Sequence, residues 1–294
     1  MTRPILVTGA TGNVGSSVLD ALSQAGVPVR AAAGSAAGLR GLAYPASSAL
    51  GNVEPVALDF TDPSTWAAAY EGVEQMFLMR PPHLSRPQKQ MVPSLEAAKA
   101  AGVRQVVFLS LQGAERNRLV PHAGLESWLR SSGLDWTFVR ASFFMQNLAT
   151  THLTDIRDRD EIMVPAGSGA TAFVDAHDVG TVAARALIDP QRHRGLAWTP
   201  TGPNALTYTE VAHVLTDTLG RTIRYAEPGA LRYAAHARNT LDLPWGMVAV
   251  TTAIYTVARV GRAGGITDDV HTVTGHRPRT FAEFAASNVH LWRR

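Results

Sequence analysis

The first half of the chain alternates short apolar runs with segments whose apolar residues recur at helical spacing. Apolar runs that end at glycine or polar residues predict buried strands at 5–8, 27–32, 53–58, 75–79, 105–109 and 136–140. Helical spacing predicts helices between them at 14–24, 63–70, 88–101 and 119–131. Strands that alternate with helices in this way predict an α/β fold with a doubly wound parallel sheet and right-handed crossovers.

Several end signals support these boundaries. Gly26 follows the first predicted helix, where a glycine commonly ends a helix, and Asp62 with Pro63 is typical of a helix start. Thr280 followed by Glu283 has the spacing of a capping box, so another helix is expected to begin there.

The pattern loosens beyond about residue 150. Helices are expected at 178–188, 208–219 and 244–260, and short strands at 172–174, 196–199 and 222–225. The most apolar late stretch, Trp245–Val257, is too short to cross a bilayer comfortably, and we expect it to form a buried helix.

Composition bounds the possible functions. The 294 residues are 46% apolar and 17% charged, and the net charge is 27 − 24 = +3. This balance is typical of a globular chain, and without a dense Lys/Arg run it gives no support to nucleic-acid binding. Without cysteine there is no disulfide or thiolate metal site, and the histidine spacings predict no metal site. We expect a cytoplasmic protein, a monomer or homodimer, that is not bound to a membrane and acts on a small molecule.

The strongest motif is the glycine loop Gly9, Ala10, Thr11, Gly12, Asn13, Val14 and Gly15, between the first strand and the first helix. In that context Gly9 permits a tight turn, Gly12 lets the backbone approach a pyrophosphate, and Gly15 lets the helix pack closely on the sheet. The free N–H groups of the helix N-terminus then favour phosphates. The loop predicts a bound nicotinamide dinucleotide; a tight turn without ligand is the alternative.

The choice between NADH and NADPH stays open. NAD sites usually place an acid at the end of strand two, but this chain has Gly34 and Ser35 there. Arg40 is expected to reach a 2′-phosphate if its loop folds back. Asp59 and Phe60 follow strand three, a turn expected beside the adenine, although Asp59 is equally suited to cap the next helix.

Other candidates follow strands whose carboxyl ends should share one edge of the sheet, where open α/β folds bind ligands. Beside the cofactor we expect Met79, Arg80, Pro81, Ser110, Ser142 and Phe143. Beside the substrate we expect Gln112, Phe144 and Asn147. The aromatic residues would form a flat wall for a quinone, and ordinary burial in the core is the simpler alternative.

Residues 5–15, 107–110, 122–126, 132–140 and 144–147 resemble the NmrA-like group of atypical short-chain dehydrogenases, and its quinone oxidoreductase and azoreductase-like members look most similar. The resemblance implies a Rossmann domain, a small C-terminal substrate domain and NAD(P)H, usually NADPH. Some relatives bind the cofactor as redox sensors without turnover. Relatives that hold NADPH commonly carry an Arg where this chain has Gly34 or Ser35.

We therefore predict an NAD(P)-binding Rossmann domain over residues 1–150, with its sheet completed by residues 170–200. Residues 151–294 are expected to form most of a smaller substrate-binding α/β region.

Catalysis by the usual Tyr-x-x-x-Lys pair is excluded, because neither Lys89 nor Lys99 has a Tyr four residues before it. The matching place holds His122 and Glu126, which share one helix face. His122, with an ordinary pKa near neutrality, is expected to donate a proton, and Glu126 to orient it or to contact the cofactor. Ser110 is expected to hydrogen-bond a substrate carbonyl or the nicotinamide. The alternatives are a solvated His–Glu pair and a strand-end cap.

Three functions remain open. The first is an NAD(P)H-dependent reductase that transfers hydride directly to a small quinone or conjugated carbonyl, without flavin or metal. The second is a nucleotide sensor or regulatory protein without turnover. The third is an epimerase or dehydratase that keeps its cofactor bound, against which the missing Tyr-x-x-x-Lys counts.

Overall fold

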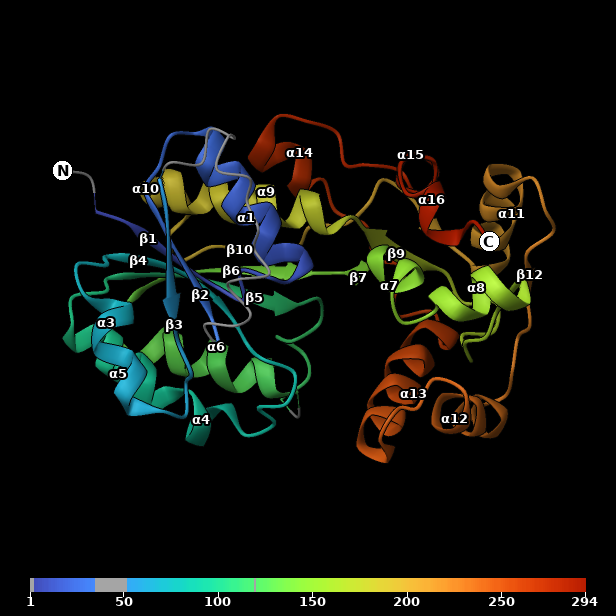
Figure 1. The fold of residues 1–294 in the computed structure, drawn as a ribbon, viewed down its shortest axis with the longest axis horizontal. Helices are drawn as coiled ribbons and strands as arrows, with labels where there is room; N and C mark the ends of the chain where they lie inside the picture. The colour runs from blue at the N-terminus through green and yellow to red at the C-terminus, as the bar shows by residue number, and fades with distance from the viewer. Residues whose placement is uncertain (1–2, 35–51, 119) are drawn as a thin grey trace. The chain divides into compact units, whose positions relative to one another are not determined.

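The computed structural model describes residues 3–34, 52–118 and 120–294 (Figure 1). These divide into two compact units. Unit 1 contains the described residues up to 141 together with 176–200 and 272–275, and unit 2 contains 142–175, 201–271 and 276–294. Ser35 and Arg40, both predicted to contact the cofactor, lie outside the described residues.

Unit 1 is built on a seven-stranded sheet in the order β10-β6-β5-β4-β1-β2-β3, and every neighbouring pair is parallel. Its strands are β1 Ile5–Thr8, β2 Val29–Ala33, β3 Val53–Ala57, β4 Gln75–Met79, β5 Gln105–Leu111, β6 Asp135–Ala141 and β10 Ala197–Trp198. The order reverses direction between β1 and β4, which is the point where open α/β sheets bind dinucleotides. The predicted doubly wound parallel sheet is therefore confirmed.

Helices cover both faces of this sheet (Figure 1), because its buried strands need apolar cover on each side. One face carries α1 Asn13–Gln24 and α9 Ala176–Ile188, and α10 Pro190–His193 follows α9. The other carries η1 Pro63–Thr65, α3 Trp66–Tyr70, α4 Pro87–Gln90, α5 Val92–Ala100 and α6 Pro121–Ser131. The core on this second face includes Leu78, Phe108 and Phe138, none of which is exposed.

Unit 2 has two small sheets. One has the order β11-β9-β7, with β7 Phe143–Phe144, β9 Thr171–Val174 and β11 Ala205–Leu206; the other pairs β8 Glu161–Ile162 with β12 Arg224–Tyr225. Its helices are α7 Gln146–Ala149, α8 Leu153–Arg159, α11 Tyr208–Leu219, α12 Ala230–Asn239, α13 Trp245–Arg259, α15 Phe281–Ser287 and α16 Val289–Trp292. The helix α14 Asp269–Thr274 has residues in both units. One aromatic core, with Phe173, Tyr208, Tyr233 and Trp292 almost fully buried, holds these short elements together.

The expectation that residues 245–257 form a buried helix is wrong in one respect. The helix exists as α13, but within it only Val248, Tyr255 and Ala258 are buried, and Trp245 is 67% exposed. Apolar composition fixes the residues that can be buried, whereas packing decides which face of a helix meets the core. A smaller difference is that 88–101 forms two helices, α4 and α5, separated at Met91.

Candidate functional site

The glycine loop lies between β1 and α1, and its shape depends on the absence of side chains. Gly9 has φ +63°, and the Gly12 N–H donates to the Gly9 carbonyl at 2.9 Å. A Cβ on Gly15 would lie 2.1 Å from the Gly9 oxygen, a contact that backbone cannot relieve. Only glycine therefore fits at position 15, and the close approach of α1 to the loop depends on it.

The start of α1 is suited to an anion. Gly12 is its N-cap, and no side chain of the described residues caps the first turn, where the backbone N–H groups have no intrahelical partner. Thr11 and Asn13 are exposed, whereas Ala10 and Val14 are buried. The loop residues therefore offer backbone donors and a positive dipole end, and they fit the pyrophosphate of a dinucleotide.

Thr8 joins β1 to β4 at the point where the strand order reverses. Its Oγ1 donates to the Phe77 carbonyl at 3.0 Å and accepts from the Met79 N–H at 2.8 Å. A Cβ on Gly9 would lie 2.3 Å from Met79 Cε, so the methionine side chain lies directly against the glycine turn. Thr8 thus fixes the end of β4 beside the loop, a role that the sequence analysis missed.

The residues predicted near the adenine have local roles in unit 1. The Asp59 carboxylate accepts from the Thr61 N–H and hydroxyl, each at 2.7 Å, and these bonds lower its pKa. Asp62, rather than Asp59, caps the following turn through the Ser64 N–H at 3.0 Å. Phe60 is 5% exposed and belongs to the core.

The end of β2 carries no acid. Gly34 directly follows β2 and is exposed, and a Cβ added there would meet no atom of the described residues within 4 Å. The described part of the chain therefore leaves open the position where NAD sites usually hold a carboxylate.

Arg80 follows β4 and organises the Pro81 turn. Its Nη1 donates to the carbonyls of Pro81, Pro82 and Leu84 at 3.0, 3.2 and 3.0 Å. Its Nε is buried without a hydrogen-bond partner among the described residues, and burial lowers the pKa of the guanidinium. One orphaned donor therefore remains at this edge of the sheet.

His122 lies in the first turn of α6 with its ring stacked on Phe108, 5.9 Å between centroids. Burial, reinforced by the positive charge of Arg80 and opposed by Glu126, lowers the pKa of His122 to about 4. The expected pKa near neutrality is therefore wrong, because desolvation penalises the imidazolium. At neutral pH the ring is uncharged, and its buried Nδ1 finds no hydrogen-bond partner in the part of the chain that the structure describes.

Glu126 forms a buried ion pair one turn further along α6. Arg140 Nε and Nη2 donate to its two carboxylate oxygens at 2.9 and 2.6 Å, and Ser110 Oγ donates at 2.6 Å. The register places Ser110 of β5 opposite Arg140 of β6. Arg140 also lies 3.3 Å from Glu115, and the bonds to Glu126 raise the pKa of Arg140.

These contacts differ from those expected for the predicted catalytic residues Glu126 and Ser110. Glu126 forms a buried ion pair with Arg140 and is not a solvated partner of His122. The Ser110 hydroxyl donates to Glu126, so its proton is not directed at a substrate or the nicotinamide. Arg140 was not among the predicted site residues. An arginine near the end of a strand with the apolar run Phe138–Val139 was the available signal, since a guanidinium removed from solvent needs a carboxylate.

Four predicted contacts belong to unit 2. Ser142 Oγ donates to the Ala172 carbonyl, and Phe143 packs edge-to-face on Phe173 with ring centroids 5.7 Å apart. Phe144 ends β7, Asn147 lies in α7, and both are half-buried. In unit 1, the Gln112 N–H donates to the Ala141 carbonyl at 2.9 Å, just past the paired ends of β5 and β6.

Two other features are absent from the described residues. No group of three or more His, Asp or Glu side chains there could hold a metal ion. None of the described helices is long and apolar enough to cross a membrane.

Comparison with known proteins supplies independent information. A model of the NmrA-like family matches residues 1–234. The NAD(P)H azoreductase of Xenophilus azovorans is 37% identical over an alignment of 293 residues, and the match covers 97% of this chain and 98% of the relative. Quinone oxidoreductase 2 of Escherichia coli strain K12 is 28% identical over an alignment of 286 residues, and the match covers 95% of this chain and 96% of the relative. The structure of the NADPH-dependent quinone oxidoreductase of Escherichia coli with NADPH has a TM-score of 0.84 at 25% identity and covers 98% of this chain and 99% of that one.

Proposed function

This chain belongs to the NmrA-like family, and we propose that it reduces a small quinone or conjugated carbonyl by direct hydride transfer from NADPH or NADH, without flavin or metal. The coarser conclusion is that it is an NAD(P)H-dependent reductase, as the sequence predicts and as relatives named azoreductase and quinone oxidoreductase support. The observation that carries the proposal is the glycine loop at the reversal of strand order. His122, which is uncharged at neutral pH, lies in the same unit, close enough to Arg80 for that positive charge to lower its pKa.

The glycine loop and the residues after β4 would hold different parts of the cofactor. Backbone N–H groups at the start of α1 would bind the pyrophosphate, and the Gly9 turn with Met79 and Arg80 would line the loop beyond it. When bound, the nicotinamide supplies the hydride. The end of β2 at Gly34 carries no carboxylate that would repel a 2′-phosphate, which supports NADPH without excluding NADH.

The polar residues of the site suit an electron-poor acceptor. His122 is neutral at physiological pH, so it can donate a hydrogen bond from an N–H but is a poor source of a full proton. A quinone or enone accepts hydride readily, so a hydrogen bond from His122 or from water to its oxygen is sufficient. Ser110, Glu126 and Arg140 act as positioning residues that tie α6, and with it His122, to β5 and β6.

The experiment is direct. The purified protein is mixed with NADPH or NADH and a panel of quinones and enones, and loss of the reduced nicotinamide absorbance is followed. We expect turnover with quinones. Tight cofactor binding without turnover of any acceptor would contradict the proposal and favour the sensor function.

Two variants test the proposed roles of His122 and Arg40. We expect His122→Phe to lower kcat/KM by about tenfold, the modest loss expected from one hydrogen bond, and to leave cofactor affinity unchanged. Titration of both cofactors against wild type and Arg40→Ala tests the proposed phosphate contact. An unchanged NADPH affinity in Arg40→Ala would remove Arg40 from the site.

A further inference from the structure

The outward side of α13 repeats small and apolar residues at the spacing of a helix–helix seam. Val248, Tyr255 and Ala258 of this helix are buried in the core of unit 2. On the opposite side, such residues recur at alternating steps of four and three, which is the 3.5-residue period of a coiled-coil seam. This outer seam consists of Gly246, Val250, Ala253, Val257 and, directly after the helix, Val260. All five are exposed, and the three valines are 53%, 47% and 60% exposed.

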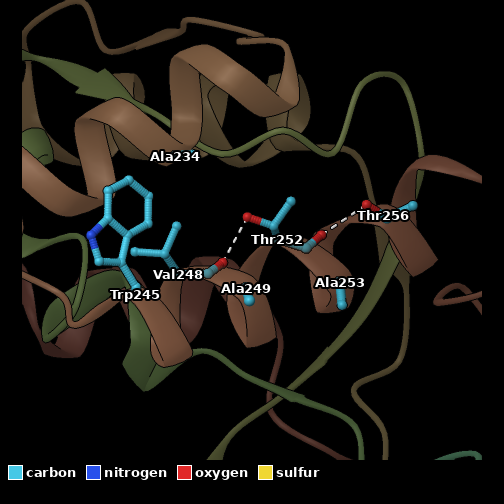
Figure 2. A pocket seen from close by; sticks show the side chains of 7 residues that line it. All are labelled: Ala234, Trp245, Val248, Ala249, Thr252, Ala253 and Thr256. Atoms are coloured by element: carbon cyan, nitrogen blue, oxygen red, sulfur yellow. Dashed lines mark hydrogen bonds between the residues drawn. The ribbon is translucent and has the colours of Figure 1, made fainter.

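The apolar surface is wider than the outer seam. Trp245, at the start of α13, is 67% exposed. Figure 2 shows Trp245, Ala249 and Ala253 along one shallow recess of this helix. Ala234 of α12 lines the same recess, and Leu231, three residues before it, is 89% exposed. Exposed apolar surface that is contiguous in this way generally marks an interaction site.

The composition of α13 favours a protein helix over a membrane as the occupant of this surface. Helices that lie on a membrane usually carry a polar face rich in Lys and Arg, whereas Arg259 is the one charged residue of α13. Side chains as small as those of glycine, alanine and valine let a second helix approach closely, because the distance between packed helices depends on the side chains at their contact.

The outer seam is complementary to itself in the antiparallel direction. A twofold axis at Ala253 would place Val250 against Val257 of a second copy, and Gly246 against Val260 of that copy. Each such contact then occurs twice, as a twofold interface requires. The glycine of each seam meets a valine of the other, so a small residue lies opposite a larger one.

The charges beside the two ends of α13 favour the same direction. Asp242, which also pairs with Arg238, lies three residues before the helix, and its side chain is 95% exposed. Arg259 and Arg262, at the other end, are exposed as well. An antiparallel pair brings the aspartate end of each helix beside the arginine end of the other, whereas a parallel pair brings like charges together. The helix dipoles favour the antiparallel arrangement too.

We propose that α13 is a dimer interface, in which the outer seam packs antiparallel against the outer seam of a second copy of this chain, with Ala253 at the twofold axis. A 15-residue helix is about 22 Å long, and its seam alone is smaller than the about 800 Å² that each partner of a stable dimer buries. We therefore expect Trp245 and Leu231 to be buried in the dimer as well. The interface is formed by unit 2 and is independent of the reaction proposed above.

The oligomeric state tests the proposal directly. We expect the full chain to be a dimer by light scattering and by sedimentation. Ala253→Glu sets two carboxylates against each other at the twofold axis and should raise the Kd of the dimer by at least about a hundredfold. The matched control is Ala286→Glu, at an exposed position of α15, which should leave that Kd within about twofold of wild type.

Two outcomes of this measurement would overturn the interface. One is a wild-type chain that stays monomeric at its highest soluble concentration, whether or not it binds lipid vesicles or another protein. The other is a dimer whose Kd does not differ between Ala253→Glu and Ala286→Glu, which would place the contact on another surface.

Cross-linking tests the position of the axis with a milder change. The chain has no cysteine, so a single introduced cysteine can form a disulfide only with a second copy. Ala253→Cys should cross-link under mild oxidation, because the axis brings its two copies within the about 7 Å between Cα atoms that a disulfide spans. Ala286→Cys should not. Equal cross-linking of these two variants would overturn the assignment of the axis.

A third cysteine variant tests the direction of the two helices. In the antiparallel pair, the two copies of residue 257 lie about 12 Å apart along the helix axis, so Val257→Cys should not cross-link to itself. A mixture of Val250→Cys and Val257→Cys should form the disulfide between the two variants. Self-cross-linking of Val257→Cys to the extent seen for Ala253→Cys would show a parallel pair and overturn the proposed direction.

Discussion

At the scale of single residues, the site is held by one buried ion pair and one uncharged histidine. Glu126 is 4% exposed and has three short bonds, to Ser110 and twice to Arg140. These residues could be named from the sequence, but not their pairing, because the partner of Glu126 depends on the register that sets β5 against β6. Helical spacing alone suggested His122 instead.

Removal of Arg140 should destabilise the fold. Arg140→Met leaves the Glu126 carboxylate buried without its main partner, and we expect the free energy of unfolding to fall by about 3 kcal/mol or more. This free energy is measured by unfolding the wild type and the variant in denaturant. Arg238→Met, which breaks the exposed Arg238–Asp242 pair, is the control and should cost less than about 1 kcal/mol. Equal losses of unfolding free energy in the two variants would show that the buried pair stabilises the fold no more than the exposed pair does.

Two buried histidines predict acid sensitivity. Burial lowers the pKa of both His122 and His152 to about 4, below the value of about 6.5 in an unfolded chain. Between those values the unfolded chain binds more protons, so this contribution to stability is complete above about pH 6.5 and is lost as the pH falls towards 4. His152→Gln should flatten the pH dependence of unfolding in that window. His290→Gln, at an exposed position, should not, and an unaltered slope in His152→Gln would contradict the assignment.

At the scale of elements, the βα turn of the glycine loop was predictable and the exposure of α13 was not. Gly9, Gly12 and Gly15 act through local geometry, which spacing reveals, and the capping box of Thr280 and Glu283 is confirmed for the same reason. Which face of α13 is buried depends on the core of unit 2, which residues far apart in the chain assemble. Two-residue strands such as β8 leave no periodic signal at all.

The glycine loop offers a matched pair of substitutions. Gly15→Ala brings a Cβ to 2.1 Å from the Gly9 oxygen, so we expect NADPH affinity to fall by at least about tenfold. Gly246→Ala, in α13 where a Cβ meets nothing within 4 Å, should keep that affinity and gain up to about 1 kcal/mol of stability. If Gly15→Ala fails to fold, Gly12→Ala, with a milder 3.3 Å contact, replaces it. Unchanged NADPH affinity in a folded variant of the glycine loop would contradict the assignment of that loop as the pyrophosphate site.

At the scale of the whole molecule, the chain comprises a Rossmann unit and a second unit with its own aromatic core. The Rossmann unit could be predicted because strands and helices alternate regularly along its sequence. The second unit was less predictable because several of its strands have only two residues and give no periodic pattern, although α11 and α15 begin with capping boxes. β10 at Ala197–Trp198, from late in the sequence, extends the Rossmann sheet beside β6.

Cofactor binding should stabilise the whole fold. A ligand that binds only the folded chain at one hundred times its Kd adds about 2.7 kcal/mol, so NADPH should raise the Tm in a concentration-dependent way. The same concentration of adenosine, which lacks the pyrophosphate, should raise it far less. Equal shifts from both compounds would show that the start of α1 does not bind the pyrophosphate.

Direct hydride transfer is the central claim, and the most direct measurement follows the hydride itself. NADPH deuterated at either face of the nicotinamide C4 is given to the purified protein with a naphthoquinone, and the rate and the label in the oxidised cofactor are measured. We predict turnover without added flavin or metal, loss of deuterium from one face only, and a primary isotope effect when that face is labelled. No turnover, or equal loss from both faces, would contradict the account.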